Sequence, residues 1–266
     1  MSELKDRVQA AAAAAVAAGD RLRALPVPLA AGGIELKSAH DFVTQADRDT
    51  EAFLVSELSK QYPQDGFLGE ETGETHVGQS DAGRWIIDPI DGTTNFIHGI
   101  PLYSISIAYE HAGQLVAGVV YAPGTDDLYV AARGMGAFHN GNPIHVSACG
   151  DPAQAVLGTS FAHRSPQFHA KNLRLLAGML SQLNDFRRLG SAALDLCYVA
   201  SGRTEGFFEV DLHIYDFAAG LVILEEAGGQ VTGWPGEAHC TQTGNVLASN
   251  GLMHDWMTDC IRKYFA

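Results

Sequence analysis

The sequence has few cysteines, and it lacks the short motifs that mark several large enzyme classes. The four cysteines form no CxxC pair, and no histidine pair accompanies them at zinc-finger spacing; they are Cys149, Cys197, Cys240 and Cys260. Isolated thiols of this kind are typical of a reducing compartment, so we expect a cytoplasmic protein without disulfides. The sequence also has no HExxH motif, no GxSxG elbow and no P-loop. The sequence therefore gives no support for a zinc protease, a serine hydrolase or a P-loop NTPase.

Basic residues are scarce. Lysine and arginine together number 17, against 31 aspartates and glutamates, which gives a net charge of −14. An acidic surface repels phosphate backbones and anionic lipids, so we expect no direct nucleic-acid binding and no membrane binding. An acidic protein that acts on an acidic substrate needs a local cation, and divalent metal ions are the usual source.

Long apolar runs are absent as well. No stretch approaches the ~20 apolar residues that a membrane-spanning helix requires. The alanine run at residues 10–15 has charged residues on both sides. This pattern is typical of an ordinary helix rather than of a signal peptide.

The order of the predicted elements indicates one layered domain. Apolar periodicity and proline positions predict helices over residues 4–25, 44–62, 167–183, 192–200 and 216–227. Short apolar runs predict strands over residues 85–87, 103–109, 115–121, 128–132, 156–161, 206–210 and 245–249. Helices and strands interleave, which favours an α/β (α+β layered) fold. We expect a single catalytic domain over residues 1–266, with an N-terminal α+β lobe over about 1–145 and a C-terminal α/β lobe over about 146–266.

Two aspartates close together follow the predicted strand at residues 85–87. The strand ends at Asp88, a proline turns the chain, and Asp91 follows three residues after Asp88. Two converging carboxylates repel each other without a cation, and Mg²⁺ prefers oxygen ligands of this kind. The N–H groups of Gly92 and Thr93 suit a phosphate at the start of a helix. The alternative is a turn in which Asp91 caps that helix, and the spacing alone leaves both interpretations open.

Three further acidic features lie elsewhere in the chain, and each alone has a simple structural explanation. Glu70 and Glu71 precede a polar stretch, where a solvated loop pair is the simple explanation and is favoured for Glu71, whereas Glu70 gains weight only together with the Asp88 site. Asp47 lies in a helix that also carries Asp49 and Glu51. Acids on such a helix are mostly solvated, and the helix dipole favours those in its first turn. Asp216 opens an apolar helix, where an N-cap is the ordinary role.

Taken together and in this order, the four features resemble the inositol monophosphatase family. The resemblance covers the whole chain, and the residues that carry it are Asp47 and residues 69–71, 85–96 and 216–220. The segment 85–96 is highly specific. The resemblance implies an α-β-α-β-α sandwich of the inositol monophosphatase / fructose-1,6-bisphosphatase type, and it also implies a homodimer.

The resemblance further implies Mg²⁺ as the cofactor, with two or three ions, and inhibition by lithium. The implied ligands of the first ion are Glu70, Asp88 and the carbonyl of Ile90. Those of the second are Asp88, Asp91 and Asp216. A third, weaker ion is implied beside Glu70 and Asp47.

The resemblance also implies catalytic and substrate-binding residues. The implied catalytic residues are Asp47, Glu70 and Thr93, and Thr93 together with Asp47 orients the attacking water. The implied substrate contacts are Asp91, Gly92, Thr93, Ala192, Glu209 and Asp216.

The implied reaction is hydrolysis of a small-molecule phosphate monoester, with myo-inositol monophosphate as the favoured substrate. Histidinol phosphate and other sugar or nucleotide phosphates are the alternatives within the superfamily. Two departures from the family pattern bear on specificity. Tyr215 stands where many members have tryptophan, and Asp211 and His213 follow Glu209 in a segment that varies among members with different substrates.

A bisphosphate substrate would require a basic cluster for its second phosphate. The candidate is the pair Arg187 and Arg188, for which a solvated or dimer-interface role is favoured. A non-enzymatic alternative is a regulatory partner of the transcription or RNA-processing machinery, since some bacterial relatives have such a role.

Overall fold

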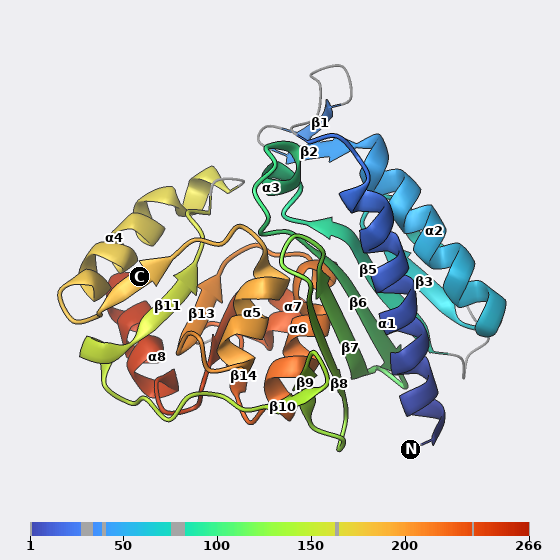
Figure 1. Ribbon diagram of the computed structural model, residues 1–266. Coiled ribbons are helices and arrows are strands. Elements are labelled where there is room, and N and C mark those ends of the chain that lie inside the picture. The colour runs from blue at the N-terminus through green and yellow to red at the C-terminus, as the bar shows by residue number, and fades with distance from the viewer. Residues whose placement is uncertain are drawn as a thin grey trace.

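The computed structural model describes residues 2–27, 34–38, 41–75, 83–162, 165–235 and 237–265 of the 266-residue chain. These residues form five layers, in which pairs of helices alternate with two β-sheets (Figure 1). The α-β-α-β-α sandwich expected from the sequence is therefore confirmed. Among the described residues, no helix is long and apolar enough to cross a lipid bilayer.

The first helical layer lies on the outer face of the larger sheet and consists of α1 (Ser2–Arg23) and α2 (Gln45–Gln61). The hairpin of β1 (Ile34–Ser38) and β2 (Asp41–Thr44) leads directly into α2. Small side chains let α1 approach the sheet closely. A Cβ atom added to Gly19 would lie 2.4 Å from a ring carbon of Tyr121.

The larger sheet contains eight strands among the described residues. Their spatial order is β10 (Asn142–Ile144), β9 (Ala137–His139), β8 (Asp127–Ala132), β7 (Gln114–Ala122), β6 (Ser104–His111), β5 (Arg84–Asp91), β3 (Gly66–Gly69) and β4 (Gly73–Thr75). Neighbours are antiparallel, except that β3 runs parallel to β5. Trp85 and Ile87 of β5 face the first helical layer, and Ile86 faces the middle one. Because helices cover both faces, β5 is an almost continuous apolar run.

The middle layer consists of α5 (Ala192–Ala200) and α6 (Ile214–Glu226), which pack between the two sheets (Figure 1). α6 contacts β6 and β7, and α5 contacts β13 (Gly206–Glu209) and β15 (Val246–Ser249). A Cβ atom on Gly118 of β7 would lie 2.3 Å from the carbonyl oxygen of Ala219. Glycine in the strand therefore lets α6 lie directly on the sheet.

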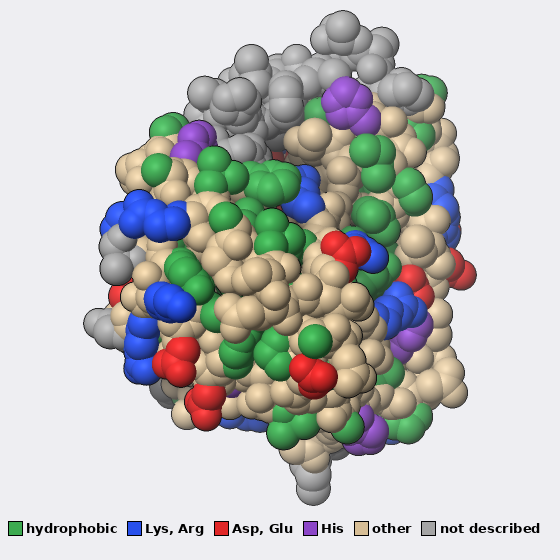
Figure 2. All heavy atoms as spheres, turned by 90° about the vertical axis from the view of Figure 1, so that its left-hand side faces the viewer, with side chains coloured by type: hydrophobic (Ala, Val, Ile, Leu, Met, Phe, Trp, Pro, Cys, Tyr) green, Lys and Arg blue, Asp and Glu red, His purple; other side chains and the backbone are tan. Residues whose placement is uncertain are grey.

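The smaller sheet has the order β12 (Asp185–Arg187), β11 (Val156–Thr159), β13, β15 and β14 (Gln230–Thr232). The short helix α7 (Cys240–Thr243) precedes β15. The outer face is covered by α4 (His169–Leu180) and α8 (His254–Tyr264). Figure 2 looks onto this side of the molecule, where apolar side chains reach the surface between scattered charges. The exposed large hydrophobic residues of α4 are Leu173 and Leu180.

Most predicted elements are present within a few residues of their expected bounds, and the helix at 192–200 matches α5. The strand predicted to end at Asp88 was too short. It continues to Asp91 because its register with β6 shifts between these two residues and pairing then resumes. The helix predicted from Asp216 begins two residues earlier, at Ile214. The strands β3 and β12 and the helix α8 were not predicted.

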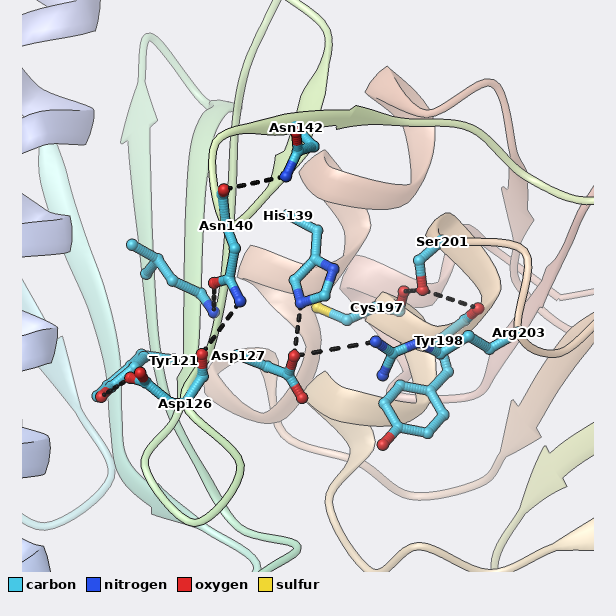
Figure 3. Close-up of polar contacts among 11 residues, drawn as sticks. Tyr121, Asp126, Asp127, His139, Asn140, Asn142, Cys197, Tyr198, Ser201 and Arg203 are labelled. Carbon is cyan, nitrogen blue, oxygen red and sulfur yellow. Dashed lines mark hydrogen bonds and ion pairs between the residues drawn. The ribbon is translucent and has the colours of Figure 1, made fainter.

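Asp127, at the start of β8, connects the larger sheet to the segment that follows α5 (Figure 3). Its carboxylate lies 2.5 Å from Nε2 of His139 in β9 and 3.8 Å from the guanidinium group of Arg203. The His139 ring stacks on Tyr129, with ring centroids 4.4 Å apart. These contacts fix the C-terminal end of α5 to the sheet, while its N-terminal end faces the site described below.

A buried ion pair holds α1 to the larger sheet. The guanidinium group of Arg7 donates to the carboxylate of Asp65, which also accepts a hydrogen bond from Nε1 of Trp85 at 2.9 Å. The same guanidinium lies over the rings of Tyr62 and Tyr109, at 4.2 and 4.3 Å from their centroids. Arg7 and Asp65 are 9% and 3% exposed, so neither charge has water as an alternative partner.

Replacing Asp65 with asparagine leaves Arg7 buried without its buried anionic partner. Breaking such a pair costs about 3 kcal/mol or more, and at ~2–4 °C per kcal/mol for a chain of this size we expect Tm to fall by roughly 6–12 °C in a circular-dichroism melt. The control is Glu3→Gln, which removes only the partner of Arg7 whose side chain is 81% exposed and should leave Tm nearly unchanged. Equal shifts in the two variants would contradict this account of the pair.

Candidate active site

The end of β5 brings two carboxyl groups to one edge of the larger sheet. Asp88 and Asp91 are 1% and 8% exposed. Oδ1 of Asp88 accepts a hydrogen bond from the backbone N–H of Ile90 at 3.0 Å, which closes the turn around Pro89. The carbonyl of Ile90 accepts a hydrogen bond from the Thr93 hydroxyl at 3.0 Å.

Asp91 is held by the middle helical layer. Its Oδ2 accepts hydrogen bonds from the Ser191 hydroxyl at 2.6 Å and from the Ala193 N–H at 2.8 Å. Ser191 is the N-cap of α5, so the start of this helix points its free donors at the Asp91 carboxylate. The two halves of the chain meet at this contact.

Gly92 and Thr93 begin the short helix α3 (Thr93–Ile97) directly after β5. Gly92 is the N-cap with φ of 94°, a conformation that L side chains rarely adopt. A Cβ atom there would also lie 3.0 Å from the carbonyl oxygen of Gly190. Glycine therefore permits both the turn and the close approach of α5.

Asp47 approaches from the first helical layer. Its Oδ2 accepts hydrogen bonds from the N–H of Thr44 at 2.8 Å and from the Thr44 hydroxyl at 2.6 Å, which is a capping box at the start of α2. Its Oδ1 lies 3.2 Å from the Thr93 hydroxyl. Asp47 is 1% exposed, so the expectation that most acids of this helix are solvated does not hold for it.

Glu70 follows β3 immediately. Because β3 runs parallel to β5, the residues after both strands lie at the same edge of the sheet. The Glu70 N–H donates to the carbonyl of Ile87 at 3.1 Å. Glu70 is half-buried. After burial, its charge is the next cause that raises the pKa of Asp88, so the structure places Glu70 beside the Asp88 site and not in a solvated loop.

Asp216 completes a cluster of three buried carboxyl groups. It occupies the third position of α6, where its Oδ2 accepts from the N–H of His213 at 2.7 Å. One oxygen from each of Asp88, Asp91 and Asp216 lies within 4.8 Å of the other two. The larger sheet and the middle helical layer thus converge on one point.

The raised pKa values show that ionising these buried carboxyl groups is unfavourable when no cation lies between them. Burial raises the pKa of Asp88 well above its ordinary value, and the charges of Glu70, Asp91 and Asp216 raise it further. Burial, reinforced by Asp216, raises the pKa of Asp91 to about 7 despite the hydrogen bond from Ser191. Burial also raises the pKa of Asp47 to about 6.

The donor set fits a hard divalent cation. Each carboxylate offers oxygen, the ligand atom that such ions prefer. A cation between the three oxygens would replace their mutual repulsion with attraction and offset the cost of burying them. Ile90 lies in the same strand end, and Glu70 follows the neighbouring strand β3.

A cavity opens beside the cluster. Its described lining includes the predicted substrate contacts Ala192 and Glu209 together with Asp91 and Asp216. Asp211, which was expected to bear on substrate specificity, also lines it. The remaining lining residues were not predicted to have a role: Thr159, Ser160, Ala162, Ser165, Gly190, Ser191, Asp195, Val210 and Leu212. Arg188 also lines the cavity, whereas its neighbour Arg187 pairs with Asp185 on the surface. Both arginines are exposed, which agrees with the expectation of a solvated pair.

Sequence reasoning missed two kinds of residue at this site. Ser191 and Ala193 support Asp91 through contacts that span about a hundred positions of sequence, and no local pattern signals them. Glu51 was expected to be solvated, yet it is 0% exposed. Its position four residues after Asp47 places it on the same helix face, which is a signal that the sequence contained.

Comparison with known proteins agrees with this geometry. The profile of the inositol monophosphatase family matches residues 3–264. An inositol-1-monophosphatase of Mesorhizobium japonicum is 44% identical over 230 residues, which cover 86% of each chain. The Nus factor SuhB of Salmonella typhimurium is 40% identical over 235 residues, covering 85% of this chain and 88% of that protein.

A solved structure shares the fold. The extragenic suppressor protein suhB of Bartonella henselae superposes with a TM-score of 0.90 at 40% identity, covering 97% of this chain and 99% of that one. The profile and the structural match thus span nearly the whole chain, and the sequence matches span 85–86% of it. The chain therefore belongs to the inositol monophosphatase family and is a phosphatase, a phosphoric monoester hydrolase.

Proposed function

We propose that this protein hydrolyses the phosphate monoester of a small polyol, with myo-inositol monophosphate as the favoured substrate and Mg²⁺ as the cofactor. The observation that carries the proposal is the buried cluster of Asp88, Asp91 and Asp216 beside a cavity lined by Glu209. The name of the Mesorhizobium relative supports the choice of substrate.

The proposed metal ligands are Glu70, Asp88, the carbonyl of Ile90, Asp91 and Asp216, and we propose two or three ions. When bound, Mg²⁺ lowers the pKa of a coordinated water and offsets the negative charge of the phosphate. Li⁺ inhibition is part of the same proposal.

The protein's own residues orient the reactants. When Thr93 donates its hydroxyl hydrogen to Asp47, 3.2 Å away, the lone pairs of its oxygen accept a hydrogen bond from the attacking water. The N–H groups of Gly92 and Thr93 at the start of α3 face the phosphate oxygens. Both roles are part of the proposal and rest on the position of α3 directly after β5.

The cavity favours hydroxyl groups over a second phosphate. Glu209, Asp195 and Asp211 line it, and Arg188 is the one cationic side chain among its described lining residues. Carboxylates accept hydrogen bonds from the hydroxyls of a polyol, whereas a second phosphate requires several basic groups. Histidinol phosphate, whose amine is cationic, is the alternative substrate that such a lining also accommodates.

A second candidate function is a regulatory partner of the transcription or RNA-processing machinery. The observation that favours it is the name Nus factor SuhB of several relatives at 39–42% identity. A regulatory role is compatible with catalysis, and we propose it in addition to the enzymatic function.

We further propose a homodimer located in the cytoplasm, with a single catalytic domain of two lobes that meet near residue 145. The four free thiols support the reducing compartment. The net charge of −14 supports the absence of direct nucleic-acid and membrane binding.

Phosphate release from a substrate panel tests the activity. The panel is inositol 1-phosphate, histidinol phosphate, fructose 1,6-bisphosphate and adenosine 3′,5′-bisphosphate, each with Mg²⁺, with EDTA and with Mg²⁺ plus Li⁺. We expect Mg²⁺-dependent turnover that is fastest with inositol 1-phosphate. Because Asp91 faces both metal and substrate, Asp91→Asn should lower kcat/KM by about 10³-fold, a loss of several kcal/mol.

The matched control for this experiment is Asp49→Asn, a change of the same chemistry at an exposed position of α2. It should retain wild-type turnover. Full activity of Asp91→Asn, or turnover in EDTA equal to that in Mg²⁺, would refute the proposed site.

The raised pKa of Asp91 predicts how the metal-free protein responds to pH. Its value of about 7 in the folded state lies above the ordinary value of an unfolded chain, so the folded state binds more protons between the two values. The contribution of this group to stability is complete below the unfolded pKa and is lost as pH rises through about 7. In EDTA, Tm should therefore fall between about pH 4 and pH 7, and more steeply for wild type than for Asp91→Asn.

Thermal melts of both proteins across this pH range measure the difference. Added Mg²⁺ should raise the Tm of wild type most at the alkaline end, where the carboxyl groups are free of protons. Parallel curves for wild type and Asp91→Asn in EDTA would contradict the assigned pKa.

A further inference from the structure

Glu51 is a fully buried acid outside the predicted set of site residues. It lies on α2, one helical turn after Asp47, and is 0% exposed. Its carboxyl group accepts hydrogen bonds from the N–H of Glu71 at 2.8 Å and from the N–H of Thr72 at 2.9 Å. It also accepts one from the Thr72 hydroxyl at 2.6 Å. Three donors from the segment after Glu70 thus converge on one side chain.

Gly69, the residue before Glu70, has no side chain and so leaves room for the carboxyl group of Glu51. A Cβ atom added to Gly69 would lie 2.4 Å from Cδ and Oε1 of Glu51 and 2.5 Å from its Oε2. Any larger residue would displace the carboxyl group from its place against the backbone. Glu51 therefore contacts the chain on both sides of Glu70.

We propose that Glu51 is a positioning residue that holds Glu70 in place for metal binding. This inference rests on the proposed Mg²⁺-dependent function, in which Glu70 is a ligand. The backbone at Glu70 is fixed from one side by its N–H bond to Ile87 of β5, at 3.1 Å. Glu51 fixes the following two residues from the other side.

Asp47 and Glu51 lie on the same face of α2 and contact two different segments of the site. Side chains four residues apart lie on the same helix face. Asp47 contacts Thr93 after β5, and Glu51 contacts the segment after β3. α2 therefore sets the position of both strand ends that reach the metal cluster.

Glu51 acts through Glu70 rather than as a ligand. Its Oε2 accepts from Glu71, and its Oε1 accepts both bonds from Thr72, so each oxygen already has a donor. Groups that orient metal ligands in this way typically contribute 10–100-fold to metal affinity. A purely structural role would instead lower stability equally with and without metal.

The test is Glu51→Gln, which keeps the shape but replaces one acceptor oxygen with an NH₂ donor that faces backbone N–H groups. Mg²⁺ binding is measured by titration calorimetry, and phosphate release from inositol 1-phosphate is measured against Mg²⁺ concentration. We expect Mg²⁺ affinity to fall by roughly 10–100-fold. At saturating Mg²⁺, kcat should recover to within about threefold of wild type, because Glu70 is still present.

Two further variants and a control are measured together with Glu51→Gln. Gly69→Ala displaces the same carboxyl group from the opposite side and should reproduce the loss of Mg²⁺ affinity. Thr72→Val removes only the hydroxyl donor, so it should give a smaller loss even if Glu51→Gln does not fold. The control, Glu57→Gln, alters an acid of the same helix that pairs with Lys60 at the surface, and its Mg²⁺ affinity should equal that of wild type.

Unchanged Mg²⁺ affinity in the folded variants, or a lower Tm with unchanged affinity, would overturn the proposal. Absence of Mg²⁺ binding to wild type would overturn it as well. If wild type binds Mg²⁺ but releases no phosphate from any substrate, the proposed activity fails, while the calorimetric comparison still decides the role of Glu51.

Discussion

The repulsion among three buried carboxyl groups is the constraint on which the site depends. Asp88, Asp91 and Asp216 approach within 4.8 Å where water is almost excluded, and burial raises the pKa values of Asp88 and Asp91. Such an arrangement is costly in a low-dielectric interior unless protons or a cation compensate it. The surrounding fold must therefore hold these groups together against their own repulsion, and a divalent cation would relieve it.

Three of the five layers hold these carboxyl groups in place. The larger sheet supplies Asp88 and Asp91 from a single strand end, because β5 runs on through an irregularity instead of stopping. The middle layer supplies Asp216 and donates to Asp91 from the start of α5. The first helical layer supplies the carboxyl groups that order the neighbouring loops. A site assembled from rigid strand and helix ends keeps its geometry better than one assembled from loops alone.

The sequence predicted the carboxylates of the site better than it predicted what surrounds them. Asp88 and Asp91 lie in one short motif after an apolar strand, so local pattern was sufficient to find them. The bonds from Ser191 and the burial of Glu51 depend on which elements meet in space, and local pattern carries no such information. The parallel pairing of β3 with β5 was missed for the same reason, since pairing of a four-residue strand depends on its distant partner.

Other errors had a local signal. In α8, Met257, Cys260, Ile261 and Tyr264 recur at helical spacing, and the first three are buried. This spacing is sufficient to predict an amphipathic helix. The extension of β5 to Asp91 differs, because a proline in the strand argued for a stop, whereas the shift in register accommodates it.

The central claim is that the cluster of Asp88, Asp91 and Asp216 is a metal site. The most direct measurement is anomalous diffraction from a crystal grown with Mn²⁺ in place of Mg²⁺. The account predicts a peak bounded by these three residues, with carboxylate oxygens at about 2.1 Å, as expected for a small divalent ion. A crystal in which Mn²⁺ binds elsewhere while this cluster shows no peak would contradict it.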